Sequence, residues 1–342
     1  MAKSDNLRKA KEEKNDEFYT QMDDIIAEIV QHPDYVKHFK GKTVLCNCDD
    51  PEWSAFVQFF IRFFPKLGIK KMISTHYTKD GSPSYKLEWS GEKMNGDTIN
   101  MIKTPLKGDG DFRSDECIEL LKASDIIVTN PPFSLYREYV EILEKYDKKF
   151  IIIGNKNSIA YKEIFPLLKE GKMFVGYNAG HGTMKFSTTP GGEATRAVPS
   201  YWFTNLDIDK VHEPLQLTKL YKGNESHYPK YDNYDAIEVS KVADIPKDYD
   251  GVMGVPITYM AEACNDQFEI LGNSSKANSG NVKRFHDNNY YRGFLGGKVK
   301  TNVNSGMPIL TSPKFGGTKC QRGDDCVYQL YWRIFIKKRK AG

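Results

Sequence analysis

Short apolar runs alternate with amphipathic segments through the first half of the chain, and this alternation limits the fold more than any other feature. The apolar runs that predict strands span residues 43–46, 71–75, 124–129 and 150–154. Segments with apolar residues at helical spacing span residues 22–30, 53–64, 116–122, 135–146 and 161–169. The alternation predicts an α/β fold with a parallel sheet and helices on both of its faces. Ligands of such sheets bind at the carboxyl ends of the strands.

The pattern changes after about residue 171, where glycines and short strand-like runs replace the helical periodicity. Residues 77–100 form a polar excursion, and residues 272–326 are dominated by turn-forming residues. A final alternating run over 327–336 predicts one strand before a basic tail. We therefore expect an α/β domain over residues 1–210 and a second region over 211–342 that packs against it.

The composition excludes several classes of protein without selecting one. The chain has 342 residues, of which 39% are hydrophobic and 27% charged, as in an ordinary globular protein. Its apolar runs are too short to cross a membrane and its charged N-terminus does not resemble a signal peptide, so we expect a cytoplasmic protein without a membrane contact. The net charge of +4 permits nucleic-acid binding without indicating it.

The six cysteines do not have the spacing of a metal site. Cys46 and Cys48 are separated by one residue rather than two, and Cys320 and Cys326 lack a second nearby Cys or His pair. We therefore expect reduced thiols and no bound metal.

The motif Asn130-Pro131-Pro132-Phe133 directly follows the strand predicted over 124–129. Its prolines fix the backbone and remove two N–H donors, so the loop presents carbonyl groups. The side-chain oxygen of Asn130 and the carbonyl of Pro131 can accept both N–H groups of an exocyclic amine such as adenine N6, which localises the nitrogen lone pair for attack on a methyl sulfonium. Phe133 can stack on the base and stabilise the charge that develops on the nitrogen. A rigid turn is the alternative, but a chance match to this motif and its variants occurs in about one chain of this length in a hundred.

Three further runs carry polar or aromatic residues near predicted strand ends or the N-terminus. Residues 108–112, a Gly-Asp-Gly-Asp-Phe run, can flank an adenine ring or form an ordinary turn. Residues 46–51 follow the first strand, where two acids can cap a helix or bind polar groups of a cofactor. Residues 16–20 include an aromatic pair that can cover a cofactor.

With these runs in this order, the sequence resembles the EcoRI-type adenine-specific DNA methyltransferases from about residue 11 to residue 337. The resemblance rests on blocks at residues 16–21, 46–51, 108–113, 124–134, 223–226, 228–237 and 250–258. It implies a Rossmann-like S-adenosylmethionine-dependent methyltransferase fold with a C-terminal DNA-recognition region, and methylation of a flipped adenine in double-stranded DNA. It also implies a monomer that acts beside a cognate restriction endonuclease or as a solitary methylase.

The resemblance assigns roles to particular residues. The amine site, and hence the catalytic motif, comprises Asn130, Pro131, Pro132 and Phe133. The cofactor S-adenosylmethionine is expected to contact Phe18, Tyr19, Cys46, Asp49, Asp50, Asp109, Asp111 and Phe112. Trp202, or alternatively Phe203, is expected to stack on the face of the flipped base opposite Phe133. No acidic residue ends the second strand at residues 73–76, which leaves the partner of the cofactor ribose unassigned.

Basic residues interleaved with aromatics follow residue 282, and the candidates for DNA contacts are Lys283, Arg284, Arg292 and Lys300. Phosphate contacts position a protein on DNA, whereas contacts to base edges specify the sequence. Each basic cluster is equally consistent with a solvated surface. Adenine in RNA and a protein glutamine are rival substrates for an Asn-Pro-Pro loop, and a DNA-binding module without activity is the rival of a different class.

Overall fold

The computed structural model describes residues 18–91, 100–179, 183–189, 192–274, 282–285, 307–311, 314, 318–322 and 325–339, and the backbone alone at 292–295 and 298–300. The chain divides into two compact units. The first comprises Met1–Ser158 and Met173–Ile208, and the second comprises Ile159–Lys172 and Asp209–Gly342. The division after Ile208 lies close to the expected boundary at residue 210, but residues 159–172 group with the second unit.

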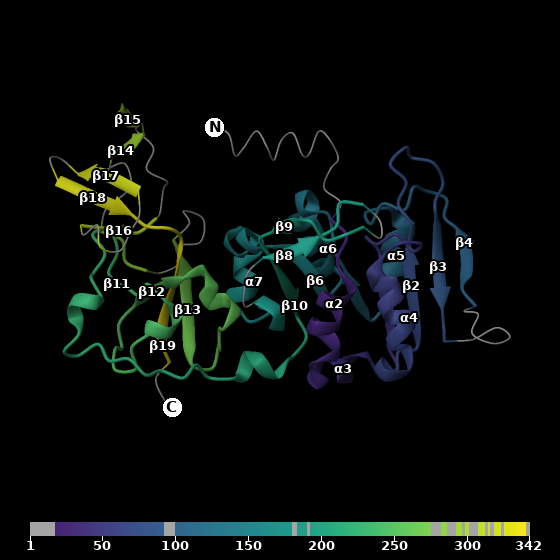
Figure 1. Cartoon of the computed structure of the whole chain (residues 1–342), viewed down its shortest axis with the longest axis horizontal. Coiled ribbons are helices and arrows are strands. Elements are labelled where there is room, and N and C mark those ends of the chain that lie inside the picture. The colour runs from purple at the N-terminus through teal and green to yellow at the C-terminus, as the bar shows by residue number, and fades with distance from the viewer. Residues whose placement is uncertain are drawn as a thin grey trace. The chain divides into compact units, whose positions relative to one another are not determined.

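The first unit is built around a sheet whose described strands have the order β4-β3-β2-β1-β5-β6-β10-β7 (Figure 1). The strands that pair in parallel at its centre are β2 (Lys71–Thr75), β1 (Thr43–Cys46), β5 (Ile126–Thr129) and β6 (Lys149–Asn155). Buried Val, Ile and Leu residues dominate β1 and β5, as in strands that are covered on both faces. This parallel centre confirms the expected α/β fold.

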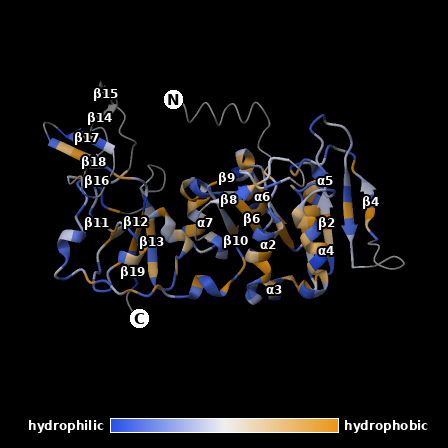
Figure 2. Cartoon of the chain, in the orientation of Figure 1, coloured by the Kyte–Doolittle hydropathy of each residue, from blue (hydrophilic) through white to orange (hydrophobic). Residues whose placement is uncertain are grey.

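The described α- and π-helices of the first unit are α2 (Met22–Ile25), η1 (Ile26–Val30), α3 (Pro33–Phe39), α4 (Ala55–Leu67), α5 (Asp115–Ala123) and α6 (Tyr136–Lys145). Serine side chains cap the start of α4 and of α5. The hydroxyl of Ser54 accepts the N–H of Phe56 at the start of α4, and Gly68 ends the helix in a left-handed conformation. Polar residues recur at every fourth position of α4, at Gln58, Arg62 and Lys66, so the helix buries its opposite, hydrophobic face (Figure 2).

Helices cover both faces of the sheet. In β10 (Ser200–Thr204), Trp202 and Phe203 point to opposite faces because successive strand residues alternate. Trp202 packs edge-on against Phe56 of α4, with ring centroids 6.0 Å apart. Phe203 packs against Tyr136 of α6, with ring centroids 5.8 Å apart. Thus α4 and α6 lie on opposite faces, as the alternation predicts.

The polar excursion expected over residues 77–100 contains a strand, and a second strand follows it. β3 (Tyr85–Trp89) pairs antiparallel with β2, and β4 (Ile102–Pro105) pairs antiparallel with β3. Both strands are largely exposed or half-buried, so polar residues are tolerated along them and the sequence does not show a buried run. At the other edge, β7 (Phe174–Val175) pairs antiparallel with β10.

A hairpin of β8 (Met184–Phe186) and β9 (Arg196–Val198) lies beside the N-terminal segment of the first unit. The backbones of Tyr19 and Ser187 exchange two hydrogen bonds, of 3.0 and 3.1 Å. Residues 18–20 are therefore tied to the end of β8, although more than 160 positions separate them in sequence.

The described residues of the second unit form two sheets, ordered β11-β12-β19-β13 and β15-β14-β17-β18-β16. The strands are β11 (Ile237–Glu238), β12 (Met253–Pro256), β13 (Phe268–Asn273), β14 (Arg292–Leu295), β15 (Lys298–Lys300), β16 (Ile309–Leu310), β17 (Thr318–Arg322), β18 (Asp325–Gln329) and β19 (Arg333–Lys338). The expectation of a loop-dominated stretch over 272–326 is thus wrong. The single strand expected over 327–336 is also wrong, because β18 and β19 belong to different sheets.

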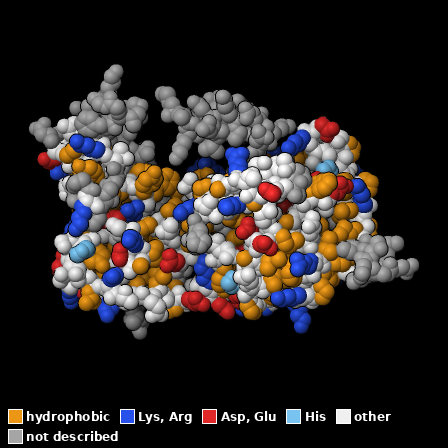
Figure 3. Space-filling model, in the orientation of Figure 1, with side chains coloured by type: hydrophobic (Ala, Val, Ile, Leu, Met, Phe, Trp, Pro, Cys, Tyr) orange, Lys and Arg blue, Asp and Glu red, His pale blue; other side chains and the backbone are white. Residues whose placement is uncertain are grey.

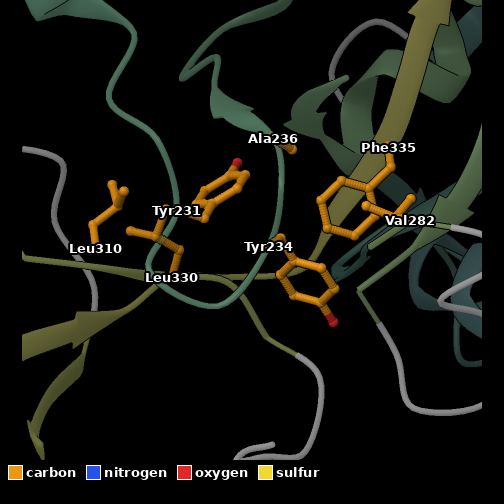
Figure 4. Close-up of a cluster of buried hydrophobic side chains, with 7 residues drawn as sticks. All are labelled: Tyr231, Tyr234, Ala236, Val282, Leu310, Leu330 and Phe335. Atoms are coloured by element: carbon orange, nitrogen blue, oxygen red, sulfur yellow. The ribbon is translucent and has the colours of Figure 1, made fainter. Parts of the chain in front are cut away.

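A hydrophobic cluster connects these two sheets (Figure 4). Leu310 of β16 and Phe335 of β19 both belong to it, together with Leu330 from the link between β18 and β19. The rings of Tyr234 and Phe335 lie 4.7 Å apart, which is ordinary tilted aromatic packing. One core therefore stabilises both sheets of the second unit. The helix α7 (Phe165–Lys169) belongs to this unit and begins later than the helix predicted from residue 161.

Candidate active site

A cavity of about 830 Å³ lies at the carboxyl ends of the parallel strands in the first unit. Its walls include residues 47–50 after β1, 75–78 after β2, and several residues of 130–135 after β5. The chain passes from β1 through α4 to β2 on one side, and from β5 through α6 to β6 on the other. The cavity thus lies where the strand order reverses, which is the usual ligand site of such a sheet.

Hydrogen bonds from neighbouring elements fix the loop after β1. The hydroxyl of Tyr139 on α6 donates to Asn47 Oδ1 at 2.5 Å. The hydroxyl of Thr75 at the end of β2 donates to the Asn47 carbonyl oxygen at 3.2 Å, and that of Ser74 donates to the Asp49 carbonyl oxygen at 3.0 Å. The loop is therefore held from both sides and presents a fixed wall to the cavity.

Asp49 joins this loop to the strand that precedes the Asn-Pro-Pro-Phe motif. Its Oδ2 accepts a hydrogen bond from the Thr129 hydroxyl, and its Oδ1 accepts one from the Ser54 hydroxyl at 3.0 Å. Burial raises the pKa of Asp49 to about 7, while hydrogen bonds from Thr129, Ser54 and the Asn130 backbone oppose the increase. The carboxyl group therefore changes its ionisation near neutral pH.

We expect Asp49→Asn to remove part of the pH dependence of stability. The folded-state pKa of about 7 exceeds the ordinary value of about 4, so the folded protein binds this proton more tightly than the unfolded chain does. The contribution of Asp49 to the free energy of unfolding is therefore largest below about pH 4 and decreases as the pH rises to about 7. Melting temperatures are measured from about pH 4 to about pH 7. As the pH rises, the melting temperature of the variant should increase relative to that of the unmodified chain. Glu119→Gln removes an exposed acid of α5 and should not change the profile; equal changes in both variants would contradict the assignment.

The loop before α5 closes another wall of the cavity. Gly110 has φ +82°, and any side chain there would collide with the carbonyl oxygen of His76, so only glycine permits this close approach. Asp111 lines the cavity, but both of its carboxylate oxygens accept hydrogen bonds from the Arg113 guanidinium, at 2.9 and 2.6 Å. These bonds lower the pKa of Asp111. Phe112 also lines the cavity and packs edge-on against Tyr139.

One polar atom of the Asn130 side-chain amide forms a hydrogen bond, and the other does not. Its Nδ2 donates to the Phe18 carbonyl oxygen at 2.6 Å. Its Oδ1 is buried and has no hydrogen-bond partner among the described residues. Leaving a buried acceptor unpaired costs about 1–3 kcal/mol, and because Asn130 also lines the cavity, its oxygen is available to a donor that enters there. Asn130 and Pro132 line the cavity, whereas Pro131 and Phe133 do not.

Phe133 belongs to an aromatic cluster instead. Its ring lies 5.4 Å from that of Phe18 and 6.2 Å from that of Phe186, and the rings of Phe18 and Phe186 lie 5.6 Å apart. Phe186 is fully buried at the end of β8. The cluster therefore joins the N-terminal segment, the hairpin and the Asn-Pro-Pro-Phe motif.

Three of the expected site residues are not placed as predicted. Trp202 is fully buried in the sheet against α4 and does not line the cavity, so its ring has no free face for a base. Cys46 is fully buried within β1, so it does not reach a cofactor in the cavity. Asp109 does not line the cavity either; its Oδ1 accepts the backbone N–H of Asp111 and thereby stabilises the turn. Phe18, Tyr19, Asp49, Asp50, Asp111 and Phe112 do line it.

The sequence did not reveal several other residues of the cavity wall. Trp53 was expected on the buried face of a helix, but it precedes the Ser54 cap and is 53% exposed at the cavity. Tyr77 is likewise exposed and lines the cavity. His76 Nδ1 lies 3.2 Å from Asp50 Oδ2, so two strand ends contribute a polar pair. The cap at Ser54 is the signal that places Trp53 outside the helix.

The expected DNA-contact residues lie in the second unit. Lys283 is exposed, with its Nζ 5.5 Å from the centroid of the Phe285 ring, and Arg284 lies over the ring of Tyr234 at 5.6 Å. The side chains of Arg292 and Lys300 lie outside the described residues. The DNA-contact role of these four residues stays a prediction.

Charges of both signs are interspersed on the face of the molecule shown in Figure 3. Within the described residues, no group of three or more His, Cys, Asp or Glu side chains has the arrangement of a metal site. The six cysteines are unbridged. No helix of the described part of the chain is long and apolar enough to cross a membrane.

A parallel-centred sheet with a cavity at its switch point, and an Asn-Pro-Pro-Phe loop at the adjoining strand end, define a Rossmann-like methyltransferase. The model of the family of adenine-specific methyltransferases EcoRI matches residues 6–339, and the chain belongs to this family.

Curated relatives agree with this assignment. The type II methyltransferase M.EcoRI of Escherichia coli is 47% identical over 289 residues, which cover 78% of this chain and 88% of that protein. M.MpnI of Mycoplasma pneumoniae is 40% identical over 281 residues, covering 78% and 84% of the two chains, and M.MgeORF184P of Mycoplasma genitalium is 38% identical over 282 residues, covering 78% and 85%. No solved structure matches the chain. The chain is therefore a site-specific DNA methyltransferase that acts on adenine.

Proposed function

We propose that Asn130, Pro131, Pro132 and Phe133 form the site that receives the exocyclic amine of a flipped adenine. The observation that carries this proposal is the buried and unpartnered Asn130 Oδ1 beside the cavity. That oxygen accepts one N–H of the amine, and the carbonyl of Pro131 accepts the other. The Nδ2 of Asn130 is engaged by the Phe18 carbonyl, which fixes the amide orientation so that its oxygen faces the substrate.

The aromatic cluster supports the same role. Phe133 supplies a ring next to the amine site, and Phe18 and Phe186 brace that ring from the N-terminal segment and from β8. A braced ring keeps its face toward a base and attracts the positive charge that develops on the nitrogen. Phe186 acts only as a support in this scheme because it is fully buried.

The cavity fits S-adenosylmethionine as the cofactor. Its volume of about 830 Å³ lies in the range of small-molecule sites, and its wall offers both carboxylates and exposed aromatic rings. When bound, S-adenosylmethionine supplies an activated methyl group on a sulfonium. Asp49 offers a carboxylate to a cation when it is ionised. Trp53 and Tyr77 offer rings to an adenine, and the Asp50–His76 pair offers polar atoms to ribose hydroxyls.

We propose double-stranded DNA as the substrate and the second unit as the region that recognises it, through Lys283, Arg284, Arg292 and Lys300. A monomer in the cytoplasm, with or without a cognate endonuclease, is the arrangement that the family resemblance favours.

Sequencing of methylated DNA tests the function directly. The chain is expressed in a host that lacks DNA methylation, and the host genome is read by single-molecule sequencing. We expect N6-methyladenine at one recurring short sequence, and its absence when Asn130→Ala replaces the unmodified chain. Genomic DNA without any recurring modified adenine would contradict the function, and full modification by the Asn130→Ala variant would contradict the proposed site.

A further inference from the structure

Arg196 on β9 carries a positive charge that no described residue neutralises. It is exposed, and its guanidinium carbon lies 4.9 Å from the centroid of the Phe18 ring. Its guanidinium forms no ion pair with the described residues and lies over the aromatic face of Phe18. A guanidinium stacked on an aromatic ring keeps its N–H donors directed outward, so they remain available to a planar or tetrahedral anion.

The hairpin register places this charge next to the proposed amine site. Arg196 pairs directly with Phe186 across the hairpin, so their side chains lie on the same face. Phe186 and Phe18 both contact the ring of Phe133, and the carbonyl of Phe18 holds Asn130. Arg196 is therefore one aromatic ring away from the Asn-Pro-Pro-Phe motif.

The chemistry of the substrate identifies the anion. Arg196 does not line the cavity, which argues against a carboxylate of the cofactor as its partner. DNA carries one phosphate per nucleotide, and a base that enters the amine site brings its own phosphodiester to the entrance of that site. An exposed guanidinium beside the entrance can form two parallel hydrogen bonds to such a phosphate.

We propose that Arg196 binds the backbone phosphate of the target nucleotide and so holds the extruded adenine at Asn130. This inference rests on the proposed function, because it takes the Asn130 loop as the base site. The contact stabilises the flipped nucleotide and carries no sequence information, since phosphate contacts position rather than specify.

The test compares Arg196→Gln with Lys185→Ala. Lys185 is an exposed cation on β8, and it pairs with Ala197, so it lies on the opposite face of the same hairpin. The substrate is a duplex that contains the sequence identified by methylation mapping. Rates of methyl transfer are measured together with DNA affinity at several salt concentrations. A second duplex carries an uncharged methylphosphonate at the target nucleotide.

For Arg196→Gln we expect kcat/KM to fall about 10- to 100-fold, and the slope of log Kd against log salt to decrease by about one. The methylphosphonate should impair the unmodified chain by a similar factor and should add little to the Arg196→Gln defect, because both changes remove one contact. Arg196→Lys should recover the salt slope and part of the rate, since it keeps the charge without the bidentate geometry. Lys185→Ala should leave all of these quantities unchanged.

Two outcomes would overturn the proposal. The first is unchanged kinetics and an unchanged salt slope in Arg196→Gln. The second is that the methylphosphonate lowers kcat/KM of Arg196→Gln by the same factor as it lowers that of the unmodified chain. Binding of S-adenosylmethionine and the melting temperature serve as checks that Arg196→Gln is folded. The proposed function fails separately, if Asn130→Ala still methylates the duplex. If Asn130→Ala is inactive but Arg196→Gln is fully active, the proposed phosphate contact is refuted and the proposed function is not.

Discussion

Asn130→Ala is expected to lower the rate of methyl transfer by about 10²–10³-fold, the loss typical when one preorganised hydrogen-bonding group of an active site is removed. The substitution removes the buried Oδ1 that has no partner among the described residues, and with it one acceptor for the amine. Single-turnover kinetics with a duplex that contains the mapped sequence measure the chemical step. The affinity for S-adenosylmethionine, measured by calorimetry, should change much less than the rate.

Two further variants separate this effect from local damage. Asn130→Ala also removes the hydrogen bond to the Phe18 carbonyl, which can loosen residues 18–20. Asn130→Asp also loses the donor to the Phe18 carbonyl but keeps a side-chain acceptor, so it should retain more activity than alanine does. Asn157→Ala replaces an exposed asparagine outside the cavity wall and should be fully active. A rate for Asn130→Ala within threefold of the unmodified chain would be incompatible with the proposed site.

Arg333→Met is expected to lower the free energy of unfolding by about 3–5 kcal/mol, the usual cost of breaking a buried ion pair by removing one partner. Glu238 is fully buried, and its carboxylate accepts hydrogen bonds from Arg333 Nε at 2.9 Å and Nη2 at 2.7 Å. Without Arg333, no other described cation is paired with the buried Glu238 carboxylate. Differential scanning calorimetry should show a decrease in melting temperature of roughly 10 °C.

The matching double variant and an exposed ion pair are the controls. Arg333→Met combined with Glu238→Leu replaces both charges by apolar groups and should recover most of the lost stability. Asp325→Asn breaks the bond to Arg322 at a carboxylate that is 70% exposed, and should cost less than about 1 kcal/mol. A double variant that is as unstable as Arg333→Met, or an equally large effect of Asp325→Asn, would contradict this account of the buried pair.

The sequence predicted the parallel centre of the first unit because the information is local. Each central strand is a short apolar run, and each connecting helix has its own period, so no distant residue is needed to recognise them. The same reasoning failed for β3 and β4, which are half-exposed and polar. It also failed for residues 327–336, where an alternating pattern does not show that the chain turns from one sheet to another at Leu330.

The residues of the candidate site likewise fall into those that the sequence could predict and those that it could not. Asn130-Pro131-Pro132-Phe133 stands out in the sequence because its chemistry is contained in four adjacent residues after a buried strand. Trp202 was misassigned because an aromatic residue in a strand faces either a core or a ligand, and only the packing of α4 against it decides which.

By itself, the sequence predicted a methyltransferase-type sheet, and it placed the motif proposed to bind the amine at one strand end. Only the tertiary structure decided what surrounds that motif. The buried oxygen of Asn130, the Phe18 carbonyl that orients it and the cation at Arg196 come from segments separated by tens of residues. Their proximity depends on a hairpin that pairs with the N-terminal segment, and such long-range pairing leaves no periodic signal in the residues that make it.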